Sequence, residues 1–161
     1  MRKASLSSVV RTLGVIVGAA LFLSPLPSSA GDAPETILVI ANKSVGISKV
    51  SRDDLRPIFQ TKKDTWPDGS AAKPFNLPDN NPARHGFDAA VLGLDPDRVA
   101  RYWIDRKIRG GERPPQNAPS SAVMVKVVSK TAGAVGYVEA AAVDASVKVI
   151  AKVVDGQVVA P

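Results

Sequence analysis

The chain has 161 residues, of which 21 are basic and 15 are acidic, and it contains no cysteine. Without cysteine it can form neither a disulfide nor a thiolate metal site, and it cannot be a lipoprotein, whose lipid is attached to a cysteine. The single histidine, His85, provides too few ligands for a typical zinc site. We therefore expect no metal, no cofactor and no disulfide framework.

The first thirty residues have the pattern of a secretory signal peptide. Three basic residues accompany an apolar run over residues 13–23, and the small residues Ser28-Ser29-Ala30 follow. These features are typical of a cleaved export signal, and the run is short for a membrane span. We predict a signal peptide over residues 1–30, a periplasmic or secreted protein, and no membrane span after cleavage. An uncleaved N-terminal anchor is the alternative.

Removal of the signal leaves residues 31–161, enough for one domain with its own hydrophobic core. The mature chain keeps 18 basic and 15 acidic residues, a net charge of +3. This charge gives only a mild preference for anionic partners, and we do not expect nucleic acid as a partner.

The mature chain alternates strand patterns with amphipathic helix patterns. Strands are expected over residues 36–41, 73–77, 134–138, 147–153 and 157–159, the last two joined by the turn Asp155-Gly156. Helices are expected over residues 51–59, 81–93, 95–108 and 120–131. This alternation predicts an α/β or α+β domain, with three to five strands and helices packed on them.

Two of the helices have an apolar face that we expect to be buried. In the helix at 81–93 that face is Ala83, Phe87, Ala90, Val91 and Leu94, with Arg84 and Asp88 off it. In the helix at 95–108 it is Val99, Ala100, Trp103, Ile104 and Ile108.

The segment before the second helix is a candidate anion site. Free backbone N–H groups and the helix dipole attract anions where a strand leads into a helix. Asn80 or Asn81 can cap the helix, Pro82 suits its first turn, and Arg84 adds a positive charge. Asn80, Asn81 and Arg84 are therefore the candidate anion-binding residues, and a simple helix cap is the alternative.

Two motifs recur in this order in one known family. The first combines IF at 58–59, WPDG at 66–69, PFNL at 74–77 and Arg84 with Phe87, and the second is TAGAVGYV at 131–138. Together they resemble the periplasmic phosphate-binding proteins of ABC transporters, which have the type II periplasmic binding protein fold. The resemblance implies an α/β fold. Family members have two lobes, and this chain has the length of a single lobe.

The resemblance also implies a phosphate site, made in the family by a Ser-Gly-Thr-Arg run and a preceding arginine at a strand end. Aligned on Arg84, the first three positions of the run are Asn81, Pro82 and Ala83, and the strand-end position is Leu77. Two hydroxyls, one backbone N–H and one guanidinium are therefore replaced. The sequence predicts at most weak binding of phosphate or another small oxyanion, because one open lobe leaves such contacts half in water.

These patterns predict an exported, non-enzymatic, solute-binding-like protein related to the substrate-binding component of phosphate ABC transporters. A transporter or another envelope protein is its expected partner. The alternative is a non-catalytic envelope interaction module that has lost its ligand. A small hydrolase using His85 is disfavoured, because no nucleophile motif such as G-x-S-x-G is present.

Overall fold

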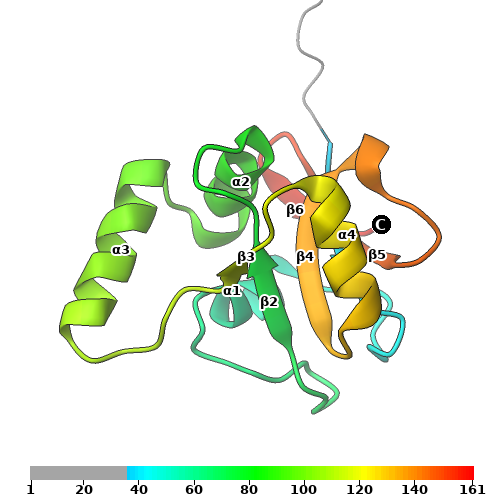
Figure 1. Ribbon diagram of the computed structural model, residues 1–161, viewed down its shortest axis with the longest axis horizontal. Helices are drawn as coiled ribbons and strands as arrows, with labels where there is room; N and C mark the ends of the chain where they lie inside the picture. Colours follow the sequence, from blue (N-terminus) through cyan, green and yellow to red (C-terminus); the bar gives the residue numbers. More distant parts are fainter. Residues whose placement is uncertain (1–35) are drawn as a thin grey trace, which may run out of the picture. The chain divides into compact units, whose positions relative to one another are not determined.

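The computed structural model describes residues 36–161, which form one mixed sheet flanked by helices (Figure 1). The expected signal peptide lies outside the described residues. The sheet has six strands in the order β3-β2-β4-β1-β5-β6. Its strands are β1 (Ile37–Ala41), β2 (Lys73–Asn76), β3 (Gln116–Asn117), β4 (Ala134–Glu139), β5 (Lys148–Val154) and β6 (Gln157–Val159).

The helices and strands confirm the α/β class. The helices are α1 (Arg52–Phe59), α2 (Pro82–Phe87), α3 (Pro96–Ile108) and α4 (Ser121–Lys130), with a π-helical turn η1 (Asp88–Leu92) and a short 3-10 turn η2 (Ala140–Ala142). The sheet has one strand more than expected, because two residues of a Gly/Pro-rich loop pair with β2 as β3. β2 runs parallel to β3 and β4, whereas β1 runs antiparallel to β4 and β5.

β4 separates the two helical layers. A Cβ on Gly136 would overlap the side chain of Met124 in α4. The next residue, Tyr137, stacks on Phe87 at 3.9 Å between ring centroids and lies 5.8 Å from Phe59. Successive side chains of a strand point to opposite faces. α4 therefore covers one face of β4, while α1 and α2 cover the other.

β1 lies at the centre of the sheet, between β4 and β5, and is buried on both faces. Val39, Ile40 and Ala41 are fully buried. In the described part of the chain, the buried hydrophobic residues lie between Ile37 and Val153 and form one core cluster. Among the described residues, no helix is long and apolar enough to cross a membrane.

α3 differs from its prediction. Of its expected buried face, only Val99 is buried and Trp103 is half-buried, while Ile104 and Ile108 are 60% and 79% exposed. Figure 1 shows α3 beside the β3 edge of the sheet and away from both sheet faces. Those faces are already covered by the other helices, so α3 has only a narrow surface to pack against.

Candidate anion site at the start of α2

Asn81 caps α2 with its side chain. Its Oδ1 accepts hydrogen bonds from the backbone N–H groups of Ala83 at 2.8 Å and Arg84 at 3.4 Å. Pro82 has no N–H, and Asn80 is exposed in the turn that precedes the cap. The first donors of the helix are thus used by its own cap, which limits what they can offer to an anion.

The guanidinium of Arg84 is held by three oxygen atoms. Its Nε donates to Asp88 Oδ2 at 2.8 Å, and its Nη1 donates to the carbonyl oxygen of Leu77 at 2.6 Å. The same nitrogen lies 3.1 Å from Oδ1 of Asp79. Arg84 and Asp88 are both buried, although they lie off the apolar face of this helix. The sequence identified Arg84 but not the groups that hold it.

The environment keeps Arg84 charged. Burial alone would lower its pKa, but Tyr137, Asp88 and Asp79 together raise the pKa above its usual value. Burial raises the pKa of Asp88, because a carboxylate loses hydration there, and Arg84 opposes that rise. The predicted anion site therefore contains a buried ion pair, of which Arg84 itself is one member.

His85 is exposed and follows Arg84 in α2. Its Nε2 lies 2.6 Å from the carbonyl oxygen of Asp79, which can only accept a hydrogen bond, so this nitrogen is the donor. Among the described residues, no three His, Asp or Glu side chains are grouped as metal ligands.

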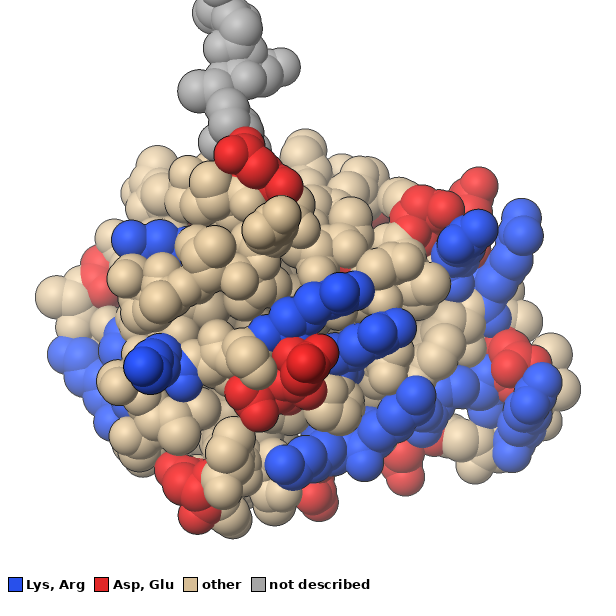
Figure 2. Space-filling view, turned by 180° about the vertical axis from the view of Figure 1, so that it is seen from behind, with Lys and Arg blue, Asp and Glu red and all other residues tan. Residues whose placement is uncertain are grey.

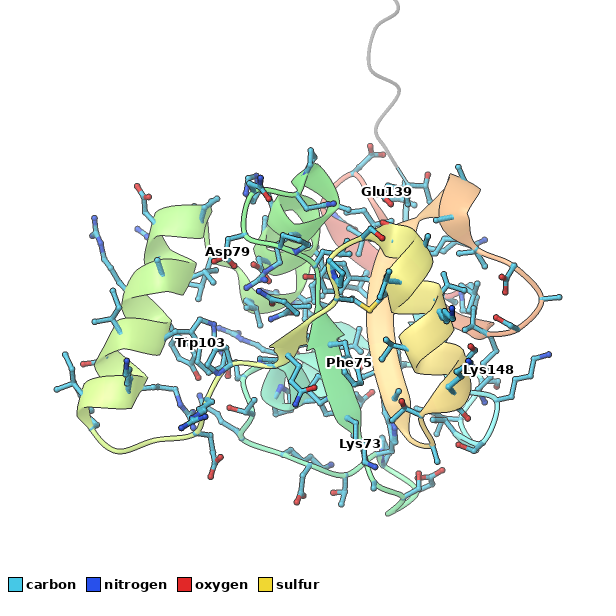
Figure 3. All side chains as sticks on the ribbon, in the orientation of Figure 1. Lys73, Phe75, Asp79, Trp103, Glu139 and Lys148 are labelled. Atoms are coloured by element: carbon cyan, nitrogen blue, oxygen red, sulfur yellow. The ribbon has the colours of Figure 1, made fainter. Side chains whose placement is uncertain are left out.

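A cavity of about 440 Å³ lies between this site and α3. Figure 3 shows Asp79, from the loop after β2, and Trp103, from α3, on either side of this space. The remaining lining includes Arg84, His85 and Asp88, whereas Asn80 and Asn81 do not line it. Two carboxylates and one guanidinium face this cavity, so its charge does not favour an anion.

The TAGAVGYV motif follows α4 and forms most of β4, which pairs with β2 next to the same site. The backbone N–H of Lys73 donates to the carbonyl oxygen of Gly133 at 3.0 Å, where β2 begins beside β4. At the other end of β2, Tyr137 Oη accepts from the N–H of Leu77 and donates to Asn76 Oδ1, both at 3.3 Å. The motif thus positions the loop that holds Arg84.

No protein-family model and no curated protein matches this sequence. Solved structures match in fold. A protein from Clostridium perfringens, described as a phosphate ABC transporter substrate-binding protein with bound phosphate, has a TM-score of 0.57 at 19% identity, over 71% of this chain and 43% of that chain. An ABC-type phosphate transport receptor from Vibrio cholerae has a TM-score of 0.56 at 16% identity, over 78% of this chain and 52% of that chain. PstS from Borrelia burgdorferi has a TM-score of 0.55 at 10% identity, over 71% of this chain and 46% of that chain.

The chain therefore has the fold of the substrate-binding proteins of phosphate ABC transporters, as its motifs indicated. It spans about half the length of these solved proteins, and its sheet and helices match a single lobe of that fold.

Proposed function

We propose that this chain is an exported, non-enzymatic, solute-binding-like lobe that binds phosphate or another small oxyanion at most weakly, at Asn80, Asn81 and Arg84. One observation supports this proposal above all: the guanidinium of Arg84 already contacts Asp88, Asp79 and the Leu77 carbonyl oxygen. Export is supported by the signal-peptide pattern of residues 1–30.

The three partners of Arg84 differ in how easily an anion could replace them. The Asp79 side chain is 88% exposed and can turn into water at little cost. The Asp88 side chain is only 7% exposed and stays in place. An anion would therefore displace Asp79 alone and contact one face of a guanidinium that Asp88 already neutralises.

Calorimetric titration of residues 31–161 with phosphate and sulfate tests this function. We expect a Kd of about 1 mM or weaker, equivalent to about 4 kcal/mol of binding free energy. Asp79→Asn removes the competing carboxylate and should tighten binding severalfold, while Asp105→Asn, at an exposed residue of α3 that does not line the cavity beside Arg84, should leave it unchanged. Micromolar binding by the unmodified chain, or binding that survives Arg84→Ala in a folded variant, would contradict the proposed site.

A second candidate function is a non-catalytic interaction module in the cell envelope. It is favoured by the exposed apolar side chains of α3, Ile104 and Ile108. Anion binding and partner binding can be tested separately, because partner binding through α3 does not require the guanidinium of Arg84 to contact a ligand.

A further inference from the structure

The outer face of α3 carries a line of side chains that suits a protein partner. Arg101, Ile104 and Ile108 are exposed and recur at helical spacing, so they share one face of the helix. Ile104 also borders a groove of about 520 Å³, whose charged lining residues are Lys107, Glu112 and Arg113 and whose apolar ones include Trp103 and Pro114. We call this surface the α3 groove.

One wall of the α3 groove is held in place by contacts within α3. The guanidinium of Arg106 lies 5.8 Å from the ring centroid of Tyr102 and 6.0 Å from that of Trp103. Its Nη1 also donates to Tyr102 Oη at 3.2 Å. Trp103, packed against the core on its other side, is therefore a positioned apolar wall of the groove.

The surroundings of the α3 groove are basic. Residues 96–115 contain six basic and three acidic side chains, a net charge of +3. Arg109 is paired with Asp105 at 3.0 Å, whereas Arg101, Lys107 and Arg113 form no ion pair within residues 36–161. Figure 2 shows Lys and Arg side chains, with acidic ones among them, on the side of the molecule that carries α3, and further Lys and Arg side chains across the middle of this face.

The positive charge around the α3 groove favours some binding partners over others. A second copy would bring another basic α3 against the first, and like charges would oppose that contact. The N-terminal thirty residues of the chain carry three basic and no acidic residues, so their positive charge would also be repelled by the basic groove. An acidic segment would meet opposite charge at Arg101, Lys107 and Arg113 while its apolar residues covered Ile104 and Ile108.

We infer that the α3 groove docks an acidic, amphipathic helical segment of a partner protein. The partner helix would place large apolar side chains, one turn apart, against Ile104 and Ile108, with carboxylates at its flanks. This inference deepens the second candidate function and does not depend on anion binding at Arg84.

Two synthetic peptides of about 18 residues, long enough to form a helix, provide the probe. Both carry Leu at helical spacing, and the other positions are mainly Glu in one peptide and mainly Lys in the other. Titrated into ¹⁵N-labelled residues 31–161, the Glu peptide should shift the amide signals of α3 and of residues 113–117. The Lys peptide should bind at least tenfold more weakly.

Variants at exposed positions test the surface itself. Ile104→Glu with Ile108→Glu should weaken binding of the Glu peptide at least tenfold, and Lys107→Glu with Arg113→Glu should also weaken it. Val159→Glu is the matched control, because Val159 is an exposed apolar residue of β6, 40% exposed, and not part of the groove. Unchanged amide spectra away from the substituted residues verify that each variant is folded.

Equal binding of the two peptides, signal changes confined to other elements, or an equal effect of Val159→Glu would overturn the inference. So would the absence of detectable binding of the Glu peptide. Because the phosphate titration uses a different ligand and different variants, failure here leaves the anion-binding proposal intact, and the converse also holds.

Discussion

Asp88 neutralises a buried arginine, so its loss should cost more stability than the loss of an exposed ion-pair partner. Removing one member of a buried pair leaves the other charge without compensation, at a cost of about 3 kcal/mol or more. Asp88→Ala should therefore lower the urea midpoint of residues 31–161 strongly. The exposed pair Asp105–Arg109 provides the control, since Asp105→Ala should cost less than about 0.5 kcal/mol.

A double variant separates the ion pair from the rest of the site. Arg84→Met with Asp88→Leu removes both charges, and it should be more stable than Asp88→Ala. It should remain less stable than the unmodified chain, because the Leu77 carbonyl oxygen loses its donor, at a cost of about 1 kcal/mol. If the double variant is no more stable than Asp88→Ala, the uncompensated charge of Arg84 is not the cause of the instability of Asp88→Ala.

Gly133 joins α4 to β4 in a backbone conformation that other residues adopt only at a cost in stability. Its φ is +77°, and an added Cβ would overlap the carbonyl oxygen of Ala71. Gly133→Ala should cost about 3 kcal/mol, the sum of a left-handed alanine and a steric overlap. Gly156→Ala, in the β5–β6 turn at φ +72° with open space around it, should cost only about 1 kcal/mol.

Urea unfolding of the two glycine variants measures this difference. If Gly133→Ala costs no more than Gly156→Ala, the backbone of Ala71 can move aside, and the junction between β2 and β4 is less tightly fixed than the structure indicates.

Most elements could be predicted because their signals are local. The cap of α1 is one example: Ser51 and Asp54 exchange hydrogen bonds at 3.1 and 3.2 Å within four residues. The position of α3 could not be predicted in this way, because its periodicity shows an apolar face but not whether a surface is left to cover it. The same limit applied to Arg84, since its contact with Asp79 depends on how the loop after β2 folds back.

The chain spans about half the length of the solved proteins of this fold and corresponds to one of their lobes. Two copies facing each other could in principle surround an anion. The surface gives little support for such a dimer: the exposed large hydrophobic residues in the described part of the chain are Ile104, Ile108 and Val159. A stable interface usually buries at least about 1,000 Å² in total, more than these three side chains can supply. Ile104 and Ile108 also lie on a basic face, which a second copy would repel.

We therefore expect residues 31–161 to be monomeric, with and without excess phosphate. Size-exclusion chromatography with light scattering should give the mass of one chain over a wide range of protein concentration. A dimer that forms only with phosphate would contradict this expectation, since the anion would then be screening or bridging positive charge between two lobes. Ile108→Glu would locate that dimer: if the substitution dissociates it, the α3 groove faces a second copy, and if it does not, the two lobes meet at another surface, such as the start of α2.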